Sequence, residues 1–387
     1  MELYIHIPFC MKKCRYCDFV SFEGMQPHTD HYITTLLMEA CQQRSKAPEP
    51  MNTVYLGGGT PSLLKPEQLR KLIDGIRSIF DISRNAEITV EANPGTITPR
   101  WLDTAVSLGI NRISLGMQAA QDQLLQRLGR IHHRHDVDQA VQEARKAGFQ
   151  NISLDLMFGI PGQSLDDWQE TLQYALSMNV EHISAYGLIP EENTPLNEDL
   201  LSGRLSLPDP EDERSMYDVL KQTMHAHGFE QYEISNFALP GFACRHNIGY
   251  WTQIPYLGLG LSAASLLNLK READGLHYTR TKNPDTFRQY DHLVLEHACE
   301  ERESESILPA EARFETVMLG LRMTRGISKS EFLRLHGVSL ESVYGQKLHY
   351  FQKHDLIRET NDRWFLTSRG MDIQNAILVE MMEEGQG

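Results

Sequence analysis

The chain has 387 residues, of which 41% are apolar and 23% are charged. These fractions are ordinary for a globular protein and exclude long disordered or collagen-like tracts. The 37 Lys and Arg residues against 52 Asp and Glu give a formal net charge of −15, which argues against strong nonspecific binding to nucleic acid or anionic lipid.

The first 235 residues alternate short apolar, β-branched segments with longer segments of helical period. The predicted strands are Leu3–Ile7, Thr53–Gly57, Glu87–Glu91, Arg112–Gly116, Ile152–Met157 and His182–Gly187. The predicted helices are Tyr32–Arg44, Glu67–Ile79, Arg100–Leu108, Val137–Ala147, Leu165–Met178 and Glu211–His227. This alternation predicts βα units around a parallel sheet.

Polar residues gather at or just after the carboxyl ends of these strands, from a cysteine loop after the first strand to Tyr186 in the sixth. In a barrel, that edge holds the active site. Six βα units also fit a doubly wound sheet, but the placement of the polar residues favours a barrel. We therefore predict an α/β fold with a partial (β/α)6 TIM-type barrel over residues 1–235.

The pattern changes near Tyr232. Residues 236–300 form a predicted bridging segment with little helical period, and residues 301–387 form a predicted, mainly helical C-terminal domain. The elements predicted for this domain are helices Arg313–Met323, Lys329–His336 and Leu340–His354, a hairpin of Leu356–Glu359 and Arg363–Leu366, and a final helix Thr367–Met382. This arrangement resembles a winged-helix module, which does not fix function. The acidic charge argues against nucleic acid as a partner.

Three of the six cysteines, Cys10, Cys14 and Cys17, form a C-x₃-C-x₂-C pattern. The first seven residues lack the features of a signal peptide, and no apolar run reaches the roughly 18 residues of a membrane span, so we expect a cytoplasmic protein. In a reducing compartment, clustered cysteines indicate metal binding rather than disulfides. Three thiolates can hold three irons of a [4Fe–4S] cluster. The alternative is a zinc site completed by His6 or His28.

The segment from Tyr4 to Phe19 resembles the signature of the radical S-adenosylmethionine (SAM) superfamily, with its cysteines matching the family ligands one for one. The resemblance implies that Cys10, Cys14 and Cys17 hold a [4Fe–4S] cluster, whose fourth iron is chelated by the amino and carboxylate groups of SAM. It also implies that an electron from the reduced cluster can split a carbon–sulfur bond of SAM and release a 5′-deoxyadenosyl radical.

The run Gly57-Gly58-Gly59-Thr60-Pro61 resembles the superfamily's GGE-type motif, in which the backbone receives the SAM amino group. Four further polar residues match the family pattern in order: Glu91, Gln118, Arg130 and Asp155. The alternative for each is a purely structural hydrogen-bonding role. The predicted SAM-binding residues are Tyr4, Gly58, Gly59, Thr60, Glu91, Gln118, Arg130 and Asp155. The neighbouring His132, His133 and His135 are interpreted as solvated residues at a helix start rather than as a metal site.

Over nearly the whole chain, the sequence resembles the group that contains anaerobic coproporphyrinogen III dehydrogenase and the HemW-type heme chaperones. The dehydrogenase pattern has a fourth cysteine where this chain has Phe19. It also has an N-terminal extension, whereas the first strand begins here at Leu3. Both differences favour the chaperones.

Residues 246–251 match the HNxxYW motif of the HemW-type proteins. Imidazole and thiolate are common axial ligands of heme iron, and aromatic faces can pack on a porphyrin. The predicted heme-binding residues are Cys244, His246, Asn247, Tyr250 and Trp251. The plain alternative is a packed loop. The segment from Tyr256 to Ser265 resembles the family's GxGAHS-type segment, but this chain has Ala264 where the family usually has a histidine. Cys41 and Cys299 are interpreted as incidental.

The resemblance implies a HemW-like heme chaperone that binds heme, a [4Fe–4S] cluster and SAM and transfers heme to an acceptor protein. The alternative is an oxygen-independent coproporphyrinogen III dehydrogenase, so enzymatic activity is left open. The implied partners are the heme acceptor and an electron donor such as a flavodoxin or an NADH-linked reductase, and no nucleic acid. A homodimer and an encounter with the membrane periphery are left open.

Overall fold

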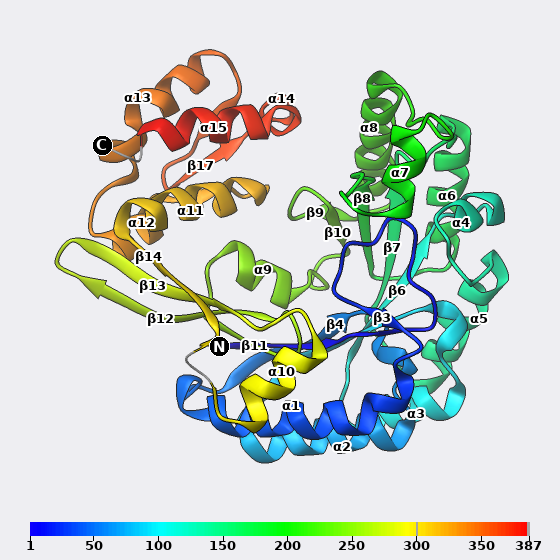
Figure 1. The fold of residues 1–387 in the computed structure, drawn as a ribbon. Coiled ribbons are helices and arrows are strands. Elements are labelled where there is room, and N and C mark those ends of the chain that lie inside the picture. The colour runs from blue at the N-terminus through cyan, green and yellow to red at the C-terminus, as the bar shows by residue number, and fades with distance from the viewer. Residues whose placement is uncertain (299–300, 385–387) are drawn as a thin grey trace.

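The computed structural model describes residues 1–298 and 301–384. A curved parallel sheet forms its centre, with helices along its outer face (Figure 1). Six parallel strands follow one another in chain order, as the sequence predicts: β1 (Glu2–Ile7), β4 (Met51–Gly58), β5 (Ile82–Ala92), β6 (Arg112–Gln118), β7 (Ile152–Phe158) and β8 (His182–Gly187).

A helix follows each of these strands, also as predicted. These helices are α1 (Thr29–Gln43), α2 (Pro66–Ile79), α3 (Pro99–Ser107), α5 (Arg134–Ala147), α6 (Leu165–Ser177) and α8 (Pro210–Ala226). Two short helices, α4 (Asp122–Arg127) and α7 (Pro195–Leu201), were not predicted. Both lie in connections at the carboxyl end of the sheet.

The two faces of the sheet differ in polarity because successive residues of a strand point to opposite sides. In β1, Leu3, Ile5 and Ile7 are fully buried in the apolar core beneath the helices. The alternate residues Glu2, Tyr4 and His6 face the inner side. The sheet does not close, because β14 and β9 remain at its two ends. The fold is therefore a partial barrel with a polar interior.

The bridging segment, together with short strands just before and just after it in the chain, continues this sheet at both edges. On one side, β11 (Tyr256–Leu259) pairs in parallel with β1. Antiparallel strands β12 (Ala264–Glu272), β13 (Gly275–Lys282) and β14 (Glu303–Ile307) follow outward. On the other side lie β10 (Asn236–Ala238) and β9 (Glu230–Gln231). The segment also contains helices α9 (Arg245–Trp251) and α10 (Phe287–Leu295), although its helical period is weak.

The C-terminal residues build a second apolar core around Trp364, Phe332 and Tyr344, which are fully buried. The elements are α11 (Pro309–Arg322), β15 (Ile327–Ser328), α12 (Lys329–His336), α13 (Leu340–Lys353), β16 (Ile357–Glu359), β17 (Arg363–Leu366), α14 (Ser368–Asp372) and α15 (Gln374–Glu384). The predicted final helix is interrupted at Ile373 between α14 and α15. The predicted boundaries at residues 235 and 300 stay a prediction.

Several polar contacts join this C-terminal unit to the barrel. The guanidinium of Arg322 lies over the ring of Trp251, 4.5 Å from its centroid. Asp372 forms an ion pair with Arg214 of α8 at 2.6 Å. Helix α9 lies between β4 and α11, so it contacts both units (Figure 1). Within the described residues, no helix is both long and apolar enough to span a membrane.

Candidate functional site: the carboxyl rim of the barrel

The cysteine loop is held at its base by two short parallel strands, β2 (Phe9–Cys10) and β3 (Phe22–Glu23). Cys10 is buried, and Cys14 and Cys17 are half-buried. The backbone of Arg15, between them, donates to Leu128 O at 2.9 Å and accepts from Leu196 N at 2.9 Å. Backbone contacts on both sides therefore fix the loop over the rim.

The glycine run lies directly beneath this loop because Gly59 N donates to Ile7 O at 2.9 Å and Thr60 N donates to Phe9 O at 2.8 Å. A Cβ at Gly59 would come within 2.8 Å of both carbonyl oxygens, so only glycine allows this approach. Gly58 has φ +104°, and a Cβ there would meet the His6 ring. The Thr60 hydroxyl donates to Cys10 Sγ at 3.6 Å.

Glu91, near the end of β5, contacts the glycine run from the neighbouring strand. Its Oε2 accepts from Gly58 N at 3.1 Å, and its Oε1 accepts from the Tyr55 hydroxyl at 2.8 Å. Burial raises the pKa of Glu91 to about 7, against the lowering effect of the Tyr55 hydrogen bond. Tyr4 lies beside Tyr55 with ring centroids 6.3 Å apart. Each of the two carboxylate oxygens of Glu91 keeps a lone pair that can accept a further hydrogen bond.

Arg130 contacts the cysteine loop from the opposite side. Its guanidinium donates to Gly116 O at 2.8 Å and to Cys14 Sγ at 3.4 Å. His132 supports it, because Nδ1 accepts from Arg130 Nε at 3.4 Å and Nε2 donates to Met117 O at 3.2 Å. Burial and the charge of Arg130 lower the pKa of His132 to about 4. His132 therefore acts as a neutral support.

This position corrects one expectation from the sequence. His132 is 2% exposed and is not a solvated residue at a helix start. His133 and His135 do lie on the surface, with side chains 60% and 75% exposed. The loop after β6 folds His132 back onto Met117, and nothing in the local pattern of polar residues predicts that fold.

The two remaining predicted SAM residues lie on β6 and β7. Asp155 accepts from the Ser114 hydroxyl at 3.0 Å, and burial raises its pKa. Gln118 has a left-handed backbone with φ 65°, at a register shift between the two strands. Such irregularities redirect a side chain at a barrel rim. All eight predicted SAM residues lie in the barrel, at or toward this rim.

The thiols fit a cluster better than a single zinc ion. Zinc–sulfur bonds of about 2.3 Å bring tetrahedral thiolates to within about 4 Å of one another. The sulfurs of Cys10, Cys14 and Cys17 do not all lie within 4.8 Å. His6 is not free to be a fourth ligand, because Nδ1 contacts the Tyr4 hydroxyl at 3.0 Å and Nε2 contacts Val20 O at 2.8 Å. Donors already reach two of the sulfurs, as anionic thiolates require.

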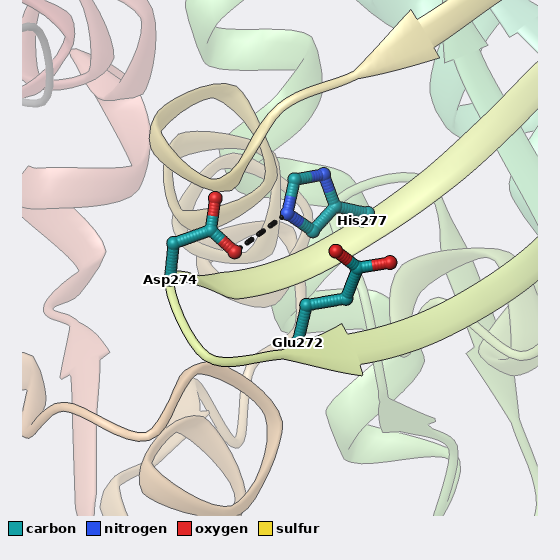
Figure 2. A group of neighbouring side chains, drawn as sticks. All are labelled: Glu272, Asp274 and His277. Atoms are coloured by element: carbon teal, nitrogen blue, oxygen red, sulfur yellow. Dashed lines mark hydrogen bonds and ion pairs between the residues drawn. The ribbon is translucent and has the colours of Figure 1, made fainter.

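Another group of possible ligands lies at the tip of the β12–β13 hairpin (Figure 2). Asp274 and His277 form an ion pair at 2.9 Å, and Glu272 lies beside them. Among the described residues, no other group of three His, Cys, Asp or Glu brings its ligand atoms within 4.8 Å of one another. Its acidic members are exposed, and we assign it no function.

The predicted heme motif forms helix α9, which closes the floor of the barrel opposite the cysteine loop. His246 is 1% exposed. Its Nδ1 contacts the Thr53 hydroxyl at 2.6 Å, and its Nε2 contacts the Tyr250 hydroxyl at 3.0 Å. Its ring stacks on Tyr55 with centroids 5.1 Å apart. Burial lowers the pKa of His246 to about 3, so the imidazole is neutral.

The other predicted heme residues surround this histidine. Cys244 is fully buried, and its thiol contacts Glu87 Oε1 at 3.5 Å. Asn247, Tyr250 and Trp251 are half-buried. In the structure described here, the motif is a packed helix with its histidine turned inward. Ala264 begins β12 and is half-buried.

Sequence reasoning missed Tyr55 and His132 as residues of the site. Tyr55 could have been found from the alternation in β4, since Thr53, Tyr55 and Gly57 share the inner face.

Cys41 is exposed on α1, and Cys299 lies outside the described residues. None of the five described cysteines forms a disulfide.

The fold and the rim site together define a radical SAM protein. The model of the Radical SAM superfamily matches residues 4–175, and the model of the HemN C-terminal domain matches residues 307–373. Heme chaperone HemW of Bacillus subtilis is 37% identical over 98% of this chain and 99% of its own. Heme chaperone HemW of Escherichia coli is 34% identical over 99% and 98%. The chain therefore belongs to the HemW family.

Among solved structures, coproporphyrinogen III oxidase (HemN) from Escherichia coli, a radical SAM enzyme, is similar with a TM-score of 0.81. The match covers 98% of this chain and 89% of that chain at 20% identity. At this identity the likeness concerns the fold alone.

Proposed function

We propose that the protein carries a [4Fe–4S] cluster on Cys10, Cys14 and Cys17 and binds SAM at the same rim. The observation that carries this proposal is the cysteine loop held against Gly58–Thr60, with hydrogen-bond donors to Cys10 and Cys14. When bound, the cluster supplies an open iron and one electron. Membership of the radical SAM superfamily supports both cofactors.

The chain's own residues would orient SAM around that iron. By resemblance to the superfamily motif, backbone groups of Gly58 and Gly59 would receive its amino group, and Arg130 could pair with its carboxylate. Glu91 accepts from the ribose or amino donors, and Tyr4 packs beside the ligand. Asp155 and Gln118 offer the remaining polar groups on this rim.

We further propose that the protein binds heme and passes it to an acceptor protein, and the relatives from Bacillus subtilis and Escherichia coli, which are named heme chaperones, support this proposal. Heme contact is assigned to His246, with Tyr250 and Trp251 as aromatic contacts and Asn247 and Cys244 beside them. Because both ring nitrogens of His246 have partners, ligation requires the contact with Thr53 or the contact with Tyr250 to break.

A hemin titration of the anaerobically reconstituted protein tests this assignment. We expect a Soret shift in the wild type and its loss in His246→Ala. Thr53→Val removes the contact at Nδ1 while keeping the imidazole, so it should make hemin binding faster or tighter. Unchanged hemin binding in His246→Ala would contradict the assignment.

Oxidative decarboxylation of coproporphyrinogen III is the competing activity. Phe19, at the position of the dehydrogenases' fourth cysteine, argues against it. An anaerobic assay with a chemical reductant decides the matter. Protoporphyrinogen formation at enzymatic rates would overturn the chaperone-only proposal. The proposal also includes three partners: a protein that accepts heme, a flavodoxin or an NADH-linked reductase that donates electrons, and a second copy of this chain in a homodimer.

A further inference from the structure

Tyr55 contacts both Glu91 at the rim and His246 at the floor. Its hydroxyl donates to Glu91 Oε1 at 2.8 Å. Its ring stacks on the His246 imidazole, with planes 20° apart, and also lies near Tyr4, with centroids 6.3 Å apart. Tyr55 therefore spans the interior of the barrel between the predicted SAM site and helix α9.

We propose that Tyr55 is a positioning residue that couples the SAM site to helix α9 through Glu91 and His246. The proposal rests on the SAM site proposed above. It goes beyond that site because it makes the state of the rim act on a helix at the opposite end of the barrel.

The geometry at Glu91 gives the first half of the coupling. Tyr55 and Gly58 N each occupy one lone pair of the two carboxylate oxygens. This fixes the plane of the carboxylate and leaves the remaining lone pairs for SAM. A donor arriving from SAM would change the strength of the Tyr55 hydrogen bond, because both compete for the same charge.

Strand β4 gives the second half. Thr53 and Tyr55 are two residues apart on its inner face and contact the same imidazole, one by a hydrogen bond and one by stacking. Gly57 and Gly58 continue the strand into the SAM site. A shift of Tyr55 is thus felt by His246 directly, without a rearrangement of the surrounding core.

The charge on Glu91 provides a specific readout. Titratable and charged groups that act on it come from four strands: Tyr4, Tyr55, Arg112 and Asp155. Burial and Asp155 raise its pKa, whereas Tyr55, Gly58 and Arg112 lower it. Removing only the Tyr55 hydroxyl therefore raises the pKa of Glu91 further. The carboxylate, which binds the SAM donors, then forms only at higher pH.

The test measures SAM affinity of the reconstituted protein by equilibrium dialysis between pH 6 and 8.5. Since a hydrogen bond to a charged group corresponds to about one pKa unit or more, Tyr55→Phe should move the midpoint up by about one pH unit. It should bind SAM several-fold more weakly at pH 7 and recover at pH 8.5. Glu91→Gln should bind weakly at every pH.

Tyr174→Phe is the matched control, because its hydroxyl donates to Arg134 O at 2.9 Å on the outside of the barrel. It should keep the wild-type profile. If the wild type does not bind SAM, the proposed function fails. If the wild type binds and Tyr55→Phe has the same pH profile, the inference about Tyr55 is wrong.

Amide hydrogen exchange of residues 245–251 measures the effect of the coupling on helix α9. SAM should change the protection of these amides in the wild type and in Tyr174→Phe, and this change should disappear in Tyr55→Phe. Phenylalanine keeps the stacking on His246, so the floor itself should remain folded. An equal SAM-dependent change in Tyr55→Phe would overturn the coupling.

Discussion

The carboxylate of Glu39 accepts a hydrogen bond at 2.8 Å from the guanidinium of Arg302, across 263 residues of chain, in a site closed to solvent. Tyr290, Asn283 and Gly260 N donate to the same carboxylate. All four donors come from the bridging segment and the residues that follow it, whereas Glu39 lies on α1. This ion pair therefore attaches that segment to the barrel.

Replacing Arg302 by methionine should lower the free energy of unfolding by about 3 to 5 kcal/mol, because it leaves a buried carboxylate without its cation. Urea unfolding followed by circular dichroism measures the loss. The exposed pair Arg280–Glu305 is the control, since Glu305→Gln should cost less than about 1 kcal/mol. Equal losses in the two variants would show that burial of the pair has no importance.

Glu2 makes stability depend on pH. Burial raises its pKa from 4.5 to about 8, so the folded chain holds a proton that the unfolded chain releases. Its contribution is fully present below about pH 4.5 and is lost as the pH rises toward 8, by about 1.4 kcal/mol per pH unit. Relative to the wild type, Glu2→Gln should therefore gain stability from pH 6 to 8 and level off above. If the free energy of unfolding changed with pH in the same way in the wild type and in Glu2→Gln, the raised pKa of Glu2 would be refuted.

Gly59→Ala should reduce the iron retained after anaerobic reconstitution. The new Cβ would lie 2.8 Å from Ile7 O and Phe9 O, and backbone atoms cannot move away as a flexible side chain would. Overpacking of this kind costs about 1 to 3 kcal/mol. Gly345→Ala is a suitable comparison, because its Cβ meets only Glu341 at 3.8 Å. It should stabilise α13 by about 0.5 to 1 kcal/mol and keep full iron content.

Arg130→Leu should make the reduction potential of the cluster more negative. The variant removes a positive charge and the hydrogen bond to Cys14 Sγ, both of which stabilise the reduced form. A redox titration followed by electron paramagnetic resonance gives the midpoint. Arg134→Leu, which removes a half-exposed arginine paired with Glu170, should leave the potential unchanged. A positive shift in Arg130→Leu would contradict the assignment of Cys14 as a ligand.

The six βα units could be predicted because their signal is local. Alternation of polar and apolar residues within each strand, as in Leu3–Ile7, specifies both the strand and its buried face. The rim residues could be predicted for the same reason, since each lies in or after a recognisable strand. The positions of Cys10, Glu91 and Asp155 along the chain were therefore enough to place them at the same edge of the sheet.

The environment of His246 could not be predicted in this way. Its partners Thr53 and Tyr55 lie almost two hundred residues earlier in the chain, and no local period encodes such a contact. The pairing of β11 with β1 is equally distant in sequence. Short strands and helices that depend on these contacts, including α9 and α10, have too few residues for a clear period.

The place of β1 in the sheet has a consequence for synthesis of the chain. One side of β1 pairs with β4, but the other pairs with β11. At roughly 5 to 20 residues per second, β11 leaves the ribosome on the order of ten to fifty seconds after β1. During that interval the nascent barrel presents an open, apolar edge that invites pairing with other chains. Newly made protein should therefore depend on chaperones that shield this edge until residues 256–259 arrive.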